Sequence, residues 1–200
     1  MEIVEMRAIE GPNIYSSKPV IKVLVDVKDL DNISTRDIPG FNQTLLSYLP
    51  GLSKHHCSFD EPGGFLTRLK EGTYFPHVLE HISIELLNMS GQDVAFGKAR
   101  RLQGSLYTII FGYKEKTSAL RAGRMAVKLV KVILKGQPVN MGQWISELKD
   151  MLIKGMLGPS TQAIYSEVLK MGIPVTRVGE GSFLIFGYGK YQKRIQATIS

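Results

Sequence analysis

The sequence predicts an α+β fold, in which a small mixed sheet packs with helices and a short helix–strand–strand segment follows. Segments with the alternation of strands and segments with the spacing of helices both occur, but they do not follow a regular strand–helix–strand order. Of the 200 residues, 44% are hydrophobic and 22% are charged, so the chain can bury a core. This composition excludes disordered and low-complexity proteins.

The first half of the chain is expected to form one strand and two helices. Residues 20–27 are rich in β-branched side chains, which favours a strand. A short helix is expected over residues 41–49, and a longer one over residues 76–89, where a proline stands in the first turn. Between these helices, the Pro-Gly-Gly run at 62–64 predicts an irregular loop.

The second half is expected to be richer in helix. Residues 106–112 predict a second strand, and the helical segments that follow it cover residues 117–135 and 141–153. The Gly- and Pro-containing run at 155–160 is the clearest break in the chain. After it we expect one helix over 160–171 and two strands, the second over 182–187, and no further element.

Charge and cysteine content restrict the class of protein. Residues 1–100 carry 10 basic and 13 acidic groups, whereas residues 101–200 carry 15 and 5, which predicts an anionic partner for the second half. No apolar run is long enough to span a membrane, and the N-terminus lacks the pattern of a signal peptide. A single cysteine, Cys57, excludes a disulfide framework and favours the reducing cytoplasm.

An H-x-x-E-H pattern lies within the predicted helix 76–89. His77 and His81 are one turn apart and share a helix face, on which two imidazoles can bind one Zn²⁺. Glu80 can then act as the general base toward a metal-bound water, as in inverted zincins. The apolar side chains of the helix gather on another face, so the histidines are expected to face an open cleft. The alternative is a pair of hydrogen-bonded structural histidines beside a solvated acid.

The third metal ligand must come from another part of the chain. Glu85 is poorly placed, because it lies a further turn along the same helix. The preceding loop offers several candidate ligands, namely His55, His56, Cys57, Asp60 and Glu61. Cys57 also has two alternative interpretations, as a buried structural residue or as a nucleophile activated by the neighbouring histidines.

Basic residues recur at intervals of three and four along the predicted helix 117–135. The members of this basic stripe are Arg121, Arg124, Lys128, Lys131 and Lys135. No acid occurs between Glu115 and Glu147, and like charges one turn apart repel one another. An external anion (a carboxylate, a phosphate or nucleic acid) would explain the stripe. The alternative is a solvated face that maintains solubility.

These segments together resemble the N-terminal part of the cyanophycin synthetase family. The stretches that carry the resemblance, in order, are GPNIYS after Arg7, IPGF, LPGL, HHCS, PGGF, EGTYFPHVLEHISIEL, FGKAR, AGRMAV, GPST and FGYGKYQKRIQATIS. The resemblance implies that residues 1–157 form the N-terminal domain of such a synthetase and that residues 158–200 begin its ATP-grasp ligase domain. ATP and Mg²⁺ would then act only in the ligase domains, which lie outside this chain.

Members of this family polymerise aspartate and arginine, and the resemblance carries expectations for individual residues. The product, cyanophycin, keeps a free carboxylate and a guanidinium on each unit. The N-terminal domain would hold this polymer, with Arg121, Arg124, Lys128 and Lys131 as binding residues. It would also cleave the polymer to make primers, with His77 and His81 as metal ligands and Glu80 as base. Full-length members are expected to be homo-oligomers.

One segment departs from the family pattern. Gly112 and Lys116 stand where the family is expected to have acids, so only Glu115 remains there as a candidate third ligand. Two alternatives for the whole chain stay open. One is a non-catalytic domain that docks the ligase domains, and the other is a basic nucleic-acid-binding module. The second lacks an aromatic-rich basic strand or a zinc-knuckle spacing.

Overall fold

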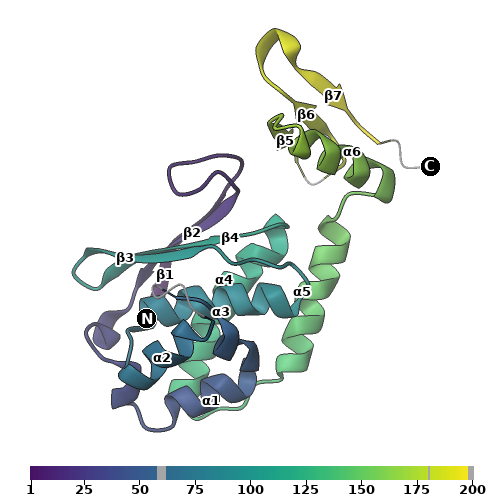
Figure 1. Cartoon of the computed structure of the whole chain (residues 1–200). Helices are drawn as coiled ribbons and strands as arrows, with labels where there is room; N and C mark the ends of the chain where they lie inside the picture. Colours follow the sequence, from purple (N-terminus) through teal and green to yellow (C-terminus); the bar gives the residue numbers. More distant parts are fainter. Residues whose placement is uncertain (58–61, 180, 198–200) are drawn as a thin grey trace.

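The computed structural model describes residues 1–57, 62–179 and 181–197. Within these ranges it has six α-helices and two small sheets, which confirms the α+β class (Figure 1). Every strand pair is antiparallel, so the expectation of a mixed sheet was wrong. The larger sheet has the order β1-β2-β4-β3, and its strands are β1 (Glu2–Ile9), β2 (Val20–Asp26), β3 (Gly97–Gln103) and β4 (Leu106–Gly112).

Five helices pack with this sheet or with one another. They are α1 (Phe41–Tyr48), α2 (Gly64–Glu71), α3 (Phe75–Met89), α4 (Lys116–Leu134) and α5 (Met141–Gly155). The sheet lies over α3 and α4, and α1 and α2 lie on the side of α3 away from the sheet (Figure 1). The inward side chains of β2 and β4, including Ile21, Val23 and Phe111, join these helices in one core.

Helix α3 lies at the centre of this arrangement and is buried on nearly all sides. Twelve of its fifteen residues are buried, including Glu80, His81 and Glu85. Strands β3 and β4 cover one side of α3, α4 covers another, and the segment 50–54 with α2 covers the histidine side. These elements bury His81, whereas His77 and Cys57 are half-buried, so the described residues cover only part of the histidine face and the open cleft stays a prediction.

Several elements were missed by the sequence patterns, for identifiable reasons. A register shift in the pairing of β1 with β2, between Ile3 and Glu5, interrupts the alternation of β1. Edge strand β3 is mostly exposed and carries few apolar residues. The Pro-Gly-Gly run is indeed a turn, but α2 begins at Gly64, directly after Gly63 adopts a left-handed backbone with φ of 83°.

The C-terminal part has its own small core. It contains α6 (Pro159–Lys170) and a sheet of three short strands, β5 (Val175–Arg177), β6 (Leu184–Phe186) and β7 (Lys193–Ile195). The expectation of two strands was wrong, because β7 adds a third along β6. Leu157, Leu184 and Phe186 form its core, separate from the main one. In the described part of the chain, no helix has the length and apolar content needed to cross a membrane.

Candidate metal site and basic surfaces

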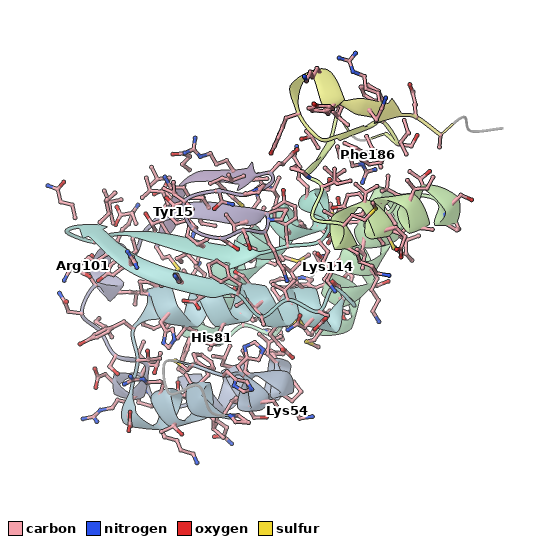
Figure 2. The ribbon with its side chains drawn as sticks, turned by 45° about the horizontal axis from the view of Figure 1, so that its top comes forward. Tyr15, Lys54, His81, Arg101, Lys114 and Phe186 are labelled. Atoms are coloured by element: carbon pink, nitrogen blue, oxygen red, sulfur yellow. The ribbon has the colours of Figure 1, made fainter. Side chains whose placement is uncertain are left out.

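Three potential metal ligands meet on the histidine side of α3. The ligand atoms of Cys57, His77 and His81 all lie within 4.8 Å of one another. The two Nε2 atoms of the histidines are 3.1 Å apart, and Cys57 Sγ lies 3.3 Å from His77 Nε2. The helix places the two imidazoles one turn apart, as the sequence predicted. Figure 2 shows His81 on the helical side of the sheet.

Aromatic packing holds this cluster in place. The Phe65 ring of α2 stacks on the His81 ring with centroids 3.9 Å apart, and it meets the His77 ring edge-on at 5.4 Å. Close packing also brings the segment 55–57 to α2, since the Phe65 N–H donates to the His55 carbonyl. Gly64 lies against Cys57, where a Cβ would approach the Cys57 nitrogen to 3.2 Å.

Burial keeps both histidines of the cluster neutral. It lowers the pKa of His77 from 6.5 to about 4, with a further contribution from the Arg68 charge. It lowers the pKa of His81 to about 2, with smaller contributions from His77 and His55. A neutral imidazole is the form that binds a metal, and two histidines with one cysteine form a donor set that suits Zn²⁺. The residues present therefore fit the metal that the sequence pattern indicates.

A further layer of hydrogen bonds surrounds the two imidazoles. The second nitrogen of His77, Nδ1, lies 2.9 Å from Thr73 Oγ1. His81 Nδ1 lies 3.0 Å from His55 Nδ1, and His55 Nε2 lies 2.8 Å from Glu85 Oε2. Sequence reasoning named His55 as a possible ligand and judged Glu85 poorly placed. In the structure they instead form a pair behind His81.

Glu80 faces a different direction from the histidines. It is 7% exposed, and its carboxylate points toward β3, where a Cβ on Gly97 would lie 2.6 Å from Glu80 Oε1. Within the described ranges, no hydrogen bond or ion pair engages this carboxylate. Burial raises its pKa from 4.5 to about 8. Its assignment as general base stays a prediction.

The other candidate ligands are distributed as follows. His56 is exposed, and Asp60 and Glu61 lie outside the described residues. Glu115 caps α4, because its carboxylate accepts hydrogen bonds from the Thr117 and Ser118 N–H groups at 2.8 and 2.7 Å. The interpretation of Cys57 as a nucleophile stays untested. A metal ligand and an activated nucleophile would both place the Cys57 Sγ close to an imidazole, so the short distance to His77 Nε2 does not distinguish the two roles.

The segment that departs from the family pattern has structural roles. A Cβ on Gly112 would approach the Val94 side chain to 3.3 Å, so that position is crowded. Lys116 Nζ donates to Glu10 at 2.9 Å. Neither position therefore supplies a ligand to the cluster.

The basic stripe on α4 is partly paired with α5. Arg121 donates two hydrogen bonds to the Glu147 carboxylate, at 2.7 and 3.2 Å, and Lys128 Nζ lies 5.3 Å from the centre of the Trp144 ring. Arg124 and Lys131 are exposed and form no ion pair within the described ranges. The spacing within helix 117–135 did not predict this ion pair, because Glu147 belongs to another helix.

A second basic surface covers the outer face of the larger sheet. Lys22, Lys98 and Arg100 alternate with the inward residues of β2 and β3, and Lys22 and Lys98 both pair with Ile110 of β4. Sequence reasoning missed this surface, since β3 was not recognised as a strand. The spacing of Lys98 and Arg100, which places both on one face of a strand, is the signal that could have found it.

Comparison with known proteins places the chain in a family. Residues 22–135 match the model of the cyanophycin synthase-like N-terminal domain. The chain is 37% identical to a cyanophycin synthetase of Crocosphaera subtropica, 36% to one of Geminocystis herdmanii and 34% to one of a Synechocystis species. Each match covers the whole chain but only 24% of the relative's length. Because the family model covers more than half of the chain, the chain belongs to the family of cyanophycin synthase-like N-terminal domains, and it spans about a quarter of the length of the cyanophycin synthetases that it matches.

Proposed function

We propose that this chain handles the cyanophycin polymer for the ligase domains of a longer synthetase, and that it hydrolyses the polymer at a zinc site. In this proposal residues 1–157 form the polymer-handling domain, and residues 158–200 begin the ATP-grasp domain. The observation that carries it is the meeting of Cys57, His77 and His81 within 4.8 Å of one another. The separate core around Leu157, Leu184 and Phe186 supports the division between the two parts.

The residues of the site have distinct roles in this proposal. Cys57, His77 and His81 hold the metal, which when bound lowers the pKa of a coordinated water and polarises a carbonyl. Glu80 receives a proton when its carboxyl group is ionised. Because burial raises its pKa to about 8, the ionised form increases as the pH rises toward 8, and the role is favoured there. This role requires the Glu80 carboxylate to turn from Gly97 toward the cluster. Phe65 excludes water from one side of His81.

Hydrolysis is tested by supplying the purified chain with metal and polymer. We expect the chain to bind one Zn²⁺, measured by mass spectrometry of the metal content, and to release soluble fragments from insoluble cyanophycin. Cys57→Ser and His81→Gln should lose metal, whereas Glu80→Gln should keep metal and lose fragment release. Asp150→Asn removes an exposed carboxylate from α5, away from the cluster, and serves as the matched control. A zinc-loaded chain that releases no fragments would refute the hydrolase.

Polymer binding rests on a separate surface. Each unit of the polymer carries a free carboxylate. Within the described ranges Arg124, Lys128, Lys131 and Lys135 are all exposed and form no ion pair, and Arg124 and Lys131 are chosen because Lys128 also lies over the Trp144 ring. Reversing both charges should weaken polymer binding by roughly tenfold, because two exposed charge contacts contribute about 1 kcal/mol or somewhat more. Lys18→Glu with Lys54→Glu makes the same change of charge elsewhere. Equal loss in both pairs would attribute binding to net charge alone.

One observation favours the alternative function, a docking domain for the ligase domains. Large apolar side chains are exposed at the end of α5 and on α6, including Ile153, Met156, Ile164 and Met171. A purely docking chain would bind neither zinc nor free polymer. The same two assays therefore separate it from the leading proposal, and salt-sensitive binding of RNA in place of polymer would favour the nucleic-acid alternative.

A further inference from the structure

Behind the candidate metal site, an unbroken line of hydrogen-bonding groups leads from a buried carboxylate to the cluster. Glu85 Oε2 lies 2.8 Å from His55 Nε2, and His55 Nδ1 lies 3.0 Å from His81 Nδ1. His81 Nε2 lies 3.1 Å from His77 Nε2, and His77 Nδ1 lies 2.9 Å from Thr73 Oγ1. Each ring nitrogen in this line therefore has a partner.

The direction of these hydrogen bonds follows from the groups at the two ends. A carboxylate only accepts, so His55 must donate from Nε2 to Glu85. When His55 carries only this proton, its Nδ1 has a lone pair and accepts the Nδ1–H of His81, whereas a His55 with both protons would donate to His81 and reverse its tautomer. In a neutral His81 this leaves Nε2 without a proton, so its lone pair points into the cluster.

The far end of the line is adaptable. With a lone pair on His81 Nε2, the 3.1 Å contact requires His77 to donate from its own Nε2, and Thr73 then donates to His77 Nδ1. A threonine hydroxyl can donate or accept. If a metal takes the place of the proton between the two histidines, His77 can move its proton to Nδ1 and donate to Thr73. The two ends of the line thus differ. Glu85 fixes the tautomer of His55 and through it that of His81, whereas Thr73 is compatible with either tautomer of His77.

We propose that Glu85 and His55 act as a positioning pair that fixes the tautomer and orientation of His81, so that its Nε2 is presented to a metal in the metal-free chain. Histidine ligands commonly donate their second ring N–H to such a partner, and loss of the partner reduces metal affinity about 10–100-fold. The pair is built in tightly, because a Cβ on Gly51 would overlap the Glu85 carboxylate. The side chains of His55 and Glu85 are 11% and 8% exposed, so water does not readily replace either partner.

The tautomer is tested without any metal. Nitrogen-15 NMR of the imidazoles in the metal-free chain should show His81 with a proton on Nδ1 and none on Nε2. His55 should show the opposite tautomer, with its proton on Nε2. A His81 protonated on Nε2 would overturn the inference, whatever the outcome of the metal and polymer assays.

The effect on the metal is tested by substitution of neighbouring residues. The adjacent histidines offer a matched pair, since His55→Gln removes the positioning residue and His56→Gln removes an exposed one. We expect a 10–100-fold loss of Zn²⁺ affinity for His55→Gln, measured by competition with a chelator, and no change for His56→Gln. The absorption spectrum of the Co²⁺-loaded chain should change only in the first, because a ligand has moved.

A second substitution guards against simple misfolding. Gly51→Ala removes no group of the site but displaces Glu85, and it should lower Zn²⁺ affinity in the same direction as His55→Gln while the chain stays folded by circular dichroism. This inference rests on the proposed zinc site, but different results would refute the zinc site and the positioning pair. A wild-type chain without metal affinity refutes the zinc site, whereas equal affinity in wild type and His55→Gln refutes the positioning pair.

Discussion

The buried carboxyl group of Glu80 provides a quantitative test of the environment of α3. Its pKa is raised from 4.5 to about 8 by burial, so the folded chain favours the protonated form. Above pH 4.5 the unfolded chain gains stability by ionising while the folded chain does not. The cost to folding therefore begins near pH 4.5, grows as the pH rises, and is complete above about pH 8. It corresponds to roughly 5 kcal/mol at its full extent and roughly 3 kcal/mol at pH 7.

Glu80→Gln replaces the carboxyl group by an uncharged group of nearly the same size. We expect both chains to have similar free energies of unfolding near pH 4. At pH 8 the variant should be more stable by several kcal/mol, because an amide has no proton to lose. Urea unfolding at a series of pH values, in the presence of a chelator to exclude metal effects, measures the difference.

The Asp150→Asn variant, which removes an exposed carboxylate from α5, provides the baseline, since its stability should follow that of wild type across the pH series. Acid protonation of His77 and His81 affects wild type and Glu80→Gln alike and cancels in the comparison. Parallel stability profiles for wild type and Glu80→Gln would show that the Glu80 carboxylate is solvated or paired in the folded chain. That result would refute the buried position beside Gly97.

Three other predictions concern the same core. In the metal-free chain His77 by itself should contribute a loss of roughly 3 kcal/mol of stability as the pH falls from 6.5 to 4, because the unfolded chain binds this proton at a higher pH than the folded chain. Urea unfolding measures the contribution as the difference between wild type and His77→Gln, in which the effects of His81 and Glu80 cancel. Glu115→Ala should cost about 1–2 kcal/mol in the same assay by removing the cap of α4, and Glu115→Asp should restore part of it. Arg121→Gln should cost less than about 1 kcal/mol and shift the melting temperature by only a few degrees, since the pair with Glu147 is more than a third exposed; a larger shift would mean that this pair locks α5 onto α4.

The elements that the sequence predicted are those whose pattern is set locally. Strand β2 has a buried β-branched face, and α4 has one apolar face, so periodicity identifies both. Edge strand β3 is held by its pairing with β4 rather than by its own apolar residues, and α2 is only eight residues long. For such elements the information lies in distant partners, which a local pattern does not contain.

The candidate site was also predictable only where it depends on local spacing. The spacing of His77 and His81 places both imidazoles on one helix face whatever surrounds the helix. The choice of Cys57 among the loop residues depends on how α2 packs against α3, and the pairing of His55 with Glu85 depends on the close approach of Gly51. Likewise, the basic stripe looked unpaired only because Glu147 belongs to another helix.

The buried polar side chains of α3 differ in whether they have hydrogen-bond partners. Ser83 donates to the Leu79 carbonyl, Glu85 accepts from His55, and His81 lies between His55 and His77. Glu80 alone among these is buried with no hydrogen bond or ion pair to any described residue. An apolar side chain at that position would remove a cost of several kcal/mol at neutral pH. A buried carboxyl group without a described hydrogen-bond partner, directly before His81 in the sequence and with its pKa raised by burial to about 8, is compatible with the proposed proton-transfer role of Glu80, which the loss of fragment release in Glu80→Gln would test.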